Sequence, residues 1–296
     1  MTYLLDKIKK YIKYLLYNVK NVFSLNLNEI IESEFENAFK ILDELGMIEY
    51  IKREYKIDYK KPELLILKDN PTFFGGYSKF ENKIIFSKKS IEREINDQLK
   101  SLGYKGIKGI EYLNKSYNTI LLYPFYINDR SIRKSIAEAF ILLIMFHEIW
   151  HSIDDSILDK LEKDSNIKDR DYLLTILNNP NNRELRASAF EVVMYYYYLV
   201  NNLYKDGKGH ITAYTNILAC RNYIEKIDIL EKNGYTNKSV PYDLGFCYGN
   251  TTVATYKSSL KENIYKIIDD IIHLDKEKAI DVIKLCGDNF DKLLYG

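Results

Sequence analysis

The sequence is short of the features that mark specialised classes of protein. It has only 3 cysteines, Cys220, Cys247 and Cys286, and no two of them form a C-x-x-C pair. This argues against a disulfide framework and against a four-cysteine zinc site, and it predicts buried thiols that act as small hydrophobic side chains. Charge of one sign is not in excess either, since 43 basic and 42 acidic residues give a formal net charge of +1. Nucleic-acid-binding proteins usually gather a basic excess on one face, so we expect no nucleic-acid partner.

Long hydrophobic runs are also missing. The longest purely apolar stretch, residues 139–146, is too short to cross a bilayer. Residues 1–23 carry 5 lysines and lack both the unbroken apolar centre and the cleavage site of a signal peptide. Their apolar residues recur at helical spacing, which favours an amphipathic helix packed on the domain; a helix on a membrane surface is the alternative. We therefore expect a cytoplasmic protein with no membrane partner.

The composition is that of an ordinary globular protein, with 46% hydrophobic and 29% charged residues. Helical spacing covers the first part of the chain, to about residue 56, and is clearest over 29–51. Short branched runs at 63–67 and 83–86, and the stretch at 73–80 that contains a glycine pair at 75–76, predict three strands with a turn before the last. A helix is predicted at 90–102, and residues 119–127 predict a further strand.

From residue 131 onward the pattern is mostly helical. We predict helices over 131–155, from the Asn-Asn-Pro-Asn-Asn bend at 178–182 to about 203, and over 213–232, 253–273 and 276–285. The expected fold class is α+β, a small and mostly antiparallel sheet on a predominantly helical body. We expect three parts: an N-terminal helical segment (1–56), a core (57–205) and a C-terminal helical segment packed on the core (206–296).

The stretch His147-Glu148-Ile149-Trp150-His151 carries the chemistry. On a helix, residues four apart lie one turn above the other, so His147 and His151 present two imidazoles to one side. Neutral imidazole is a preferred zinc ligand. Glu148 follows the first ligand directly, so its carboxylate flanks the metal, where a base can take a proton from a water that the metal activates.

Chance is a poor explanation for this motif. The chain has only 4 histidines in 296 residues, and 2 of them fall inside it. The expected number of H-E-x-x-H matches is below about 0.01. The alternative, two buried structural histidines beside a glutamate, would place three ionisable groups next to the apolar run at 139–146 without a compensating partner, which is costly. We therefore predict a Zn²⁺ site.

A catalytic zinc ion takes three protein ligands, so a third must come from elsewhere. The next helix offers Glu184 and Glu191 on one face, two turns apart, and spacing alone does not choose between them. We expect Asn182 to be the N-cap, which puts Glu184 in the first turn, and Ala187 lets the two helices approach closely. These considerations favour Glu184 as the ligand and Glu191 as the residue that orients a histidine.

This arrangement resembles the gluzincins, zinc peptidases with H-E-x-x-H on one helix and a glutamate ligand on a following helix. The second motif begins 33 residues after His151 and reads Glu184-Leu185-Arg186-Ala187-Ser188-Ala189-Phe190. It is most similar to compact members such as the minigluzincins, the repressor-cleaving peptidases of mobile elements and the catalytic domain of anthrax lethal factor. The resemblance covers roughly residues 60–203.

The resemblance implies a zincin-like body with a short sheet before the active-site helix. An edge strand of that sheet, here residues 119–127, would receive the substrate as an added strand. Several gluzincins have an Asp four residues after the glutamate ligand, where this chain has Ser188, so support for a histidine comes from a hydroxyl or from Glu191. Candidates for the residue that stabilises the transition state are His210, Tyr172 and the tyrosines at 195–198, whereas His273 is expected to be structural.

The sequence thus predicts a zinc metallopeptidase, an endopeptidase acting on a peptide or protein substrate. Glu148 is the expected general base, and His147, His151 and Glu184 are the expected metal ligands. Two alternatives stay open. One is an inactive zinc-binding module that acts as a regulatory or interaction protein, and the other is a latent peptidase blocked by its own segment.

Overall fold

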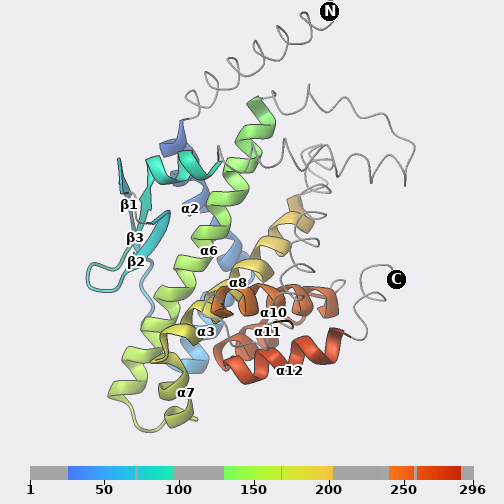
Figure 1. The fold of residues 1–296 in the computed structure, drawn as a ribbon. Coiled ribbons are helices and arrows are strands. Elements are labelled where there is room, and N and C mark those ends of the chain that lie inside the picture. The colour runs from blue at the N-terminus through green and yellow to red at the C-terminus, as the bar shows by residue number, and fades with distance from the viewer. Residues whose placement is uncertain are drawn as a thin grey trace, which may run out of the picture. The chain divides into compact units, whose positions relative to one another are not determined.

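The computed structural model describes residues 26–70, 73–95, 130–167, 169–202, 232, 240–256 and 259–287. The predicted α+β fold class is confirmed, because a mostly helical body carries one small mixed sheet (Figure 1). The strands are β1 (Glu63–Leu67), β2 (Gly75–Ser78) and β3 (Lys83–Ser87), in the order β1-β3-β2. The helices of the described residues include α2 (Leu27–Glu44), α3 (Met47–Tyr55), α6 (Arg130–Lys163), α7 (Arg170–Leu177), α8 (Pro180–Asn202), α10 (Val240–Tyr256), α11 (Ile264–Ile272) and α12 (Lys276–Gly287).

The chain divides into two compact units. The first comprises Met1–Glu34, Ile66–Phe74 and Phe86–Ile141, and the second comprises Phe35–Leu65, Gly75–Ile85 and Leu142–Gly296. Every residue of the candidate site described below belongs to the second unit. The three-part division at residues 56 and 205 stays a prediction.

Several sequence predictions can be compared directly with the observed elements. Strands occur at 63–67 and 83–87, as predicted, and a helix covers 88–95 where one was predicted at 90–102. The helix at 1–23, the strand at 119–127 and the helix at 213–232 lie outside the described residues. The described helices include none with both the length and the apolar character needed to cross a bilayer.

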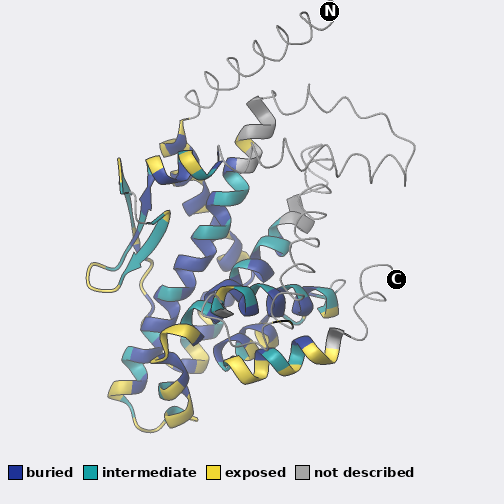
Figure 2. Ribbon diagram, viewed as in Figure 1, coloured by how far each residue is buried: buried dark blue, intermediate teal, exposed yellow. Residues whose placement is uncertain are grey.

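α6 is the long helix that carries the first motif. It continues to Lys163, eight residues beyond the predicted end, because its apolar stripe continues there. The residues of this stripe are buried (Figure 2): Phe146, Ile149, Trp150, Ile153, Ile157 and Leu161. Burying such a side chain stabilises the fold by about 1.5–3 kcal/mol. The helix that presents the histidines is therefore anchored on the core along its length.

α8 begins earlier than the sequence predicts, and this corrects the expected N-cap. The side-chain oxygen of Asn179 accepts hydrogen bonds from the backbone N–H groups of Asn181 (3.0 Å) and Asn182 (3.4 Å). Pro180 takes the first helical position, where its fixed φ and missing N–H are tolerated. Asn179, not Asn182, is therefore the cap, and Glu184 lies in the second turn of the helix rather than in the first.

α10 was not predicted, and the helix expected at 253–273 is divided between α10 and α11. α10 packs on α8 through two glycines. A Cβ atom added at Gly245 would lie 2.7 Å from Cβ of Ser188, and one added at Gly249 would lie 2.8 Å from Cβ of Val192. Only glycine permits this approach, although glycine lowers helix propensity and so hides the helix from pattern reading.

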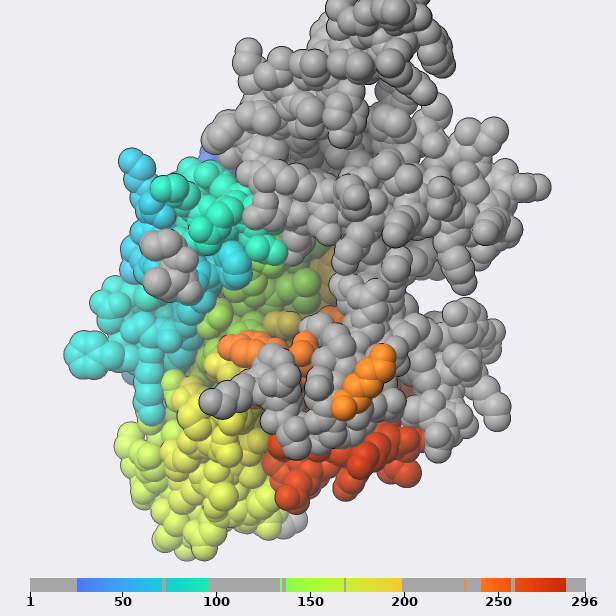
Figure 3. Space-filling view, in the orientation of Figure 1, coloured from blue at the N-terminus to red at the C-terminus, as the bar shows by residue number. Residues whose placement is uncertain are grey.

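The segment between α11 and α12 contacts α7 within the second unit. The hydroxyl of Tyr172 on α7 donates to Asp275 at 2.7 Å, just before α12, and these segments lie side by side on the surface (Figure 3). His273 stacks on Tyr172 with ring centroids 6.4 Å apart, in the structural place expected of it. Cys247 of α10 is buried, as predicted, whereas Cys220 lies outside the described residues.

Candidate metal centre

α6 brings His147 and His151 to the same side of one helical turn. Their ring centroids lie 4.8 Å apart, and their side chains are 11% and 12% exposed. Packing of the helix on the core holds both rings on a rigid element, which is what a precise metal site requires. The first part of the predicted ligand set is therefore assembled by local helical geometry.

Glu184 of α8 completes a group of three. Its Oε2 atom lies 3.1 Å from Nε2 of His147 and 3.5 Å from Nε2 of His151. One ligand atom from each residue lies within 4.8 Å of the other two. The structure thus brings together the three residues that the sequence proposed, and this group could hold a metal ion.

Glu191 fixes the orientation of the first histidine. Its Oε2 atom lies 2.9 Å from Nδ1 of His147. Because a carboxylate only accepts, Nδ1–H donates, and a neutral ring then has its lone pair on Nε2. That Nε2 faces Oε2 of Glu184 at 3.1 Å, and two acceptors approach so closely only with a proton or a cation between them. The residues present therefore fit a bound metal ion.

The same contacts shift the pKa values of His147 and Glu184. Burial alone would lower the pKa of His147, but its hydrogen bonds to Glu184 and Glu191 raise it from 6.5 to about 10. Burial would raise the pKa of Glu184, yet the two histidines outweigh it and hold that pKa well below its usual range. A metal ion that binds here displaces a proton from His147, as metal binding commonly does.

Glu148 lies next to this group and is not one of its members. Its side chain is buried, and burial raises the pKa of the carboxyl against the opposing effect of His147 and His151. A glutamate with a raised pKa is suited to accept a proton and to pass it on. Its position beside the ligands is the one expected of a general base.

Two ion pairs join α8 to α6 close to the ligands. Arg186, which is fully buried, donates to Asp154 through Nη2 at 2.8 Å and to the carbonyl oxygen of Ile176 through Nη1 at 3.2 Å. Arg183 pairs with Asp155 at 2.9 Å. Arg186 comes two residues after Glu184, so these pairs fix the register of the two helices where the ligands meet.

Tyr242 of α10 is the residue that sequence reasoning missed. Its ring stacks on His147, with centroids 5.9 Å apart and planes 13° apart, and its hydroxyl hydrogen-bonds to Glu184. Burial and the charge of Glu184 raise the pKa of Tyr242, which keeps the phenol protonated. The signal that could have found it is its spacing from Gly245 and Gly249, since residues three and seven apart share one helix face.

The structure describes two of the three candidates that the sequence nominated as transition-state stabilisers. Tyr172 hydrogen-bonds to Asp275 and to the carbonyl oxygen of His273. The tyrosines at 195–198 lie further along α8 than Glu191, with Tyr195 and Tyr198 stacked at 6.4 Å, and His210 lies outside the described residues.

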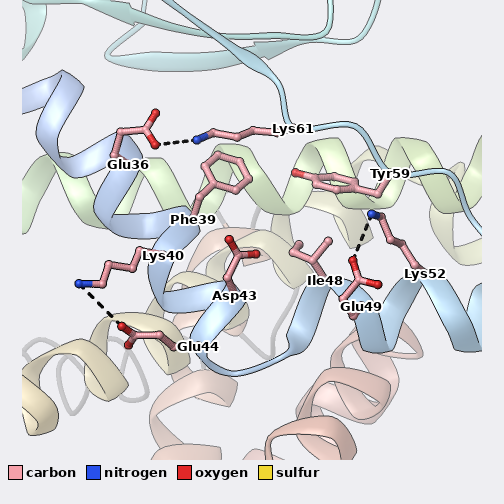
Figure 4. Close-up of a pocket in the computed structure, with 10 residues that line it drawn as sticks. All are labelled: Glu36, Phe39, Lys40, Asp43, Glu44, Ile48, Glu49, Lys52, Tyr59 and Lys61. Carbon is pink, nitrogen blue, oxygen red and sulfur yellow. Dashed lines mark hydrogen bonds and ion pairs between the residues drawn. The ribbon is translucent and has the colours of Figure 1, made fainter.

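A separate pocket of about 490 Å³ lies along α2 and α3 (Figure 4). Ion pairs line it, including Lys61 with Glu36 at 2.8 Å and Lys52 with Glu49 at 3.2 Å. None of the candidate metal ligands lines it. Its lining carries four acidic and three basic side chains, so neither sign of charge dominates it.

Comparisons with the models of known protein families, with curated proteins and with solved structures give no match to this chain. The resemblance to gluzincins is therefore carried by the two motifs alone, and function has to be inferred from the site itself.

Proposed function

We propose that this protein is a zinc-dependent peptidase of the gluzincin type. The observation that carries the proposal is the convergence of Nε2 of His147, Nε2 of His151 and Oε2 of Glu184, with Glu148 beside them outside the ligand set. Two imidazoles and one carboxylate are the ligands of several catalytic zinc sites that keep a position open. A zinc ion bound there would act as a Lewis acid on the scissile carbonyl and would acidify the attacking water.

The protein's own residues supply the proton transfers. Glu148 accepts the proton of the attacking water, and its raised pKa favours holding that proton until the leaving amine takes it. Glu191 keeps His147 in the tautomer that presents Nε2. The side chain of Glu184 is 31% exposed and Tyr242 is 51% exposed, so one side of the site is open to solvent. That opening favours an enzyme over a closed structural zinc clip.

The decisive experiment compares wild type with Glu148→Gln. Purified protein should carry about one zinc ion per chain and should cleave members of a peptide library. Glu148→Gln should keep the zinc, because Glu148 is not a ligand, and should lose several orders of magnitude in kcat, because the base is gone. Zinc is measured by elemental analysis and cleavage by mass spectrometry.

Glu162→Gln is the matched control, since Glu162 is exposed and lies on the same helix. It should leave both zinc content and turnover unchanged. Cleavage by Glu148→Gln at the wild-type rate contradicts the mechanism, and a zinc-loaded wild type that cleaves no peptide contradicts the proposed activity.

A further inference from the structure

The candidate metal centre is built by three helices, not two. α6 supplies the histidines and Glu148, α8 supplies Glu184 and Glu191, and α10 supplies Tyr242. Tyr242 lies flat against His147 and hydrogen-bonds to Glu184, so it contacts two of the three candidate ligands. It is also half exposed, which leaves its outer side accessible to a bound molecule.

The place of Tyr242 is set by the packing of α10. Tyr242, Gly245 and Gly249 share one helix face, and both glycines lie against the backbone of α8. A Cβ atom at Gly249 would lie 2.8 Å from the carbonyl oxygen of Ala189. The glycines therefore let α10 approach α8 closely enough for the phenol to reach Glu184.

The site needs a hydrogen-bond donor of this kind. Hydrolysis of a peptide bond puts negative charge on the carbonyl oxygen of the substrate, and a preorganised donor aimed at that oxygen is worth about 10²–10³ in kcat. The charged groups around Glu148 are the two histidines and the carboxylates of Glu184 and Glu191. The phenol of Tyr242 is an uncharged donor at this site, because it hydrogen-bonds to Glu184.

We propose that Tyr242 is a catalytic residue, whose phenol O–H donates a hydrogen bond to the substrate's carbonyl oxygen as that oxygen becomes negative. The inference rests on the proposed peptidase function. In the protein without substrate the same O–H donates to Glu184, so the donor is already beside the ligands and only exchanges one acceptor for another. No covalent bond forms or breaks at Tyr242.

The test is Tyr242→Phe in the full-length, zinc-loaded protein. This change keeps the ring that stacks on His147 and removes only the hydroxyl. We expect zinc content and KM close to wild type and a fall of about 10²–10³ in kcat. The affinity for a phosphinic peptide, whose tetrahedral anionic group resembles the tetrahedral intermediate of hydrolysis, should fall by a similar factor, measured by calorimetry.

Tyr265→Phe is the matched control, because Tyr265 is also a partly exposed, stacked tyrosine, here against Tyr50 on α3. It should behave as wild type in both assays. If wild type cleaves peptides and Tyr242→Phe cleaves them equally well, the role of Tyr242 is wrong while the peptidase function stands. A wild type that cleaves nothing removes the peptidase function and this role together.

A third outcome would also overturn the inference. If the copper(II)-loaded wild type shows a tyrosinate-to-copper charge-transfer band that Tyr242→Phe lacks, and Tyr242→Phe is more active than wild type, then Tyr242 is a ligand that blocks the site. In that case α10 makes the protein latent.

Discussion

At the scale of single residues, two glutamates on α8 make different contacts. Glu184 faces Nε2 of both histidines, whereas Glu191 meets only Nδ1 of His147. The contacts support an assignment, because a carboxylate that accepts from one ring nitrogen of a histidine leaves the other nitrogen to bind a metal ion. The geometry therefore supports Glu184 as the ligand and Glu191 as the residue that orients His147.

Zinc affinity should separate the two glutamates. Glu191→Ala should weaken zinc binding by about 10–100-fold, the usual effect of losing a supporting hydrogen bond to a ligand. Glu184→Ala should weaken it far more, because a ligand is lost. Competition with a chromophoric chelator measures both, with the exposed Glu277→Ala as control. If Glu191→Ala loses zinc while Glu184→Ala retains it, the assignment is reversed.

The packing of α10 gives a physical reason why this chain has Ser188 where several gluzincins have an Asp. A Cβ atom at Gly245 would lie 2.7 Å from Cβ of Ser188, so this position faces α10. A longer acidic side chain there would have to share space with that contact. The supporting carboxylate comes instead from Glu191, one turn further along the same helix.

At the scale of elements, the ligands meet because α6 and α8 are locked together. Phe190 of α8 packs against Trp150 of α6, with ring centroids 4.5 Å apart. The Arg186–Asp154 pair beside it is 0% and 1% exposed. A buried charge pair adds directional contacts to the apolar packing and so permits only one register of the two helices.

Breaking this pair should be costly. Asp154→Ala leaves the guanidinium of Arg186 buried without its carboxylate, and we expect a loss of about 3–5 kcal/mol in the free energy of unfolding. Asp154→Leu combined with Arg186→Met should lose less, because no unpaired charge remains. Urea unfolding of the zinc-free proteins gives both values.

The exposed pair between Lys79 and Asp159 provides the matched comparison. These side chains are 48% and 45% exposed, and Asp159→Ala should cost about 0–1 kcal/mol. A loss for Asp154→Ala as small as that for Asp159→Ala would show that the buried pair does not hold the two helices.

At the scale of the whole molecule, tyrosine is abundant, with 27 residues, and several of its hydroxyls are buried. Burial raises the pKa of Tyr77 and of Tyr248 to about 12. Burial also raises the pKa of Tyr55, with help from the neighbouring Asp269, and that of Tyr59. The folded protein therefore resists tyrosine ionisation at all four sites.

This predicts unfolding by alkali. In the unfolded chain tyrosine ionises with a pKa of about 10, so the stability contributed by these residues is complete below that pH and is lost as pH rises toward the folded values. Urea unfolding at increasing pH should show a falling free energy of unfolding above about pH 10. Tyr248→Phe should make that fall less steep, and an unchanged slope in this variant would contradict the cause given.

Features that depend on local spacing could be predicted before the fold was known. A spacing of four positions from His147 to His151 puts both rings on one helix face, and branched runs around a glycine pair predicted β1 and β3. These features need only the period of a helix or a strand, so they can be read before the fold is known.

Only the tertiary structure decided what depends on segments far apart in the chain. It showed which atoms Glu184 and Glu191 face, placed the cap of α8 at Asn179, and brought Tyr242 to the histidines. Periodicity assigns a residue to a face but does not say which helix covers that face. Here the covering helix depends on close backbone contact at Gly245 and Gly249, residues that weaken the helical pattern in the sequence while making the packing of α10 on α8 possible.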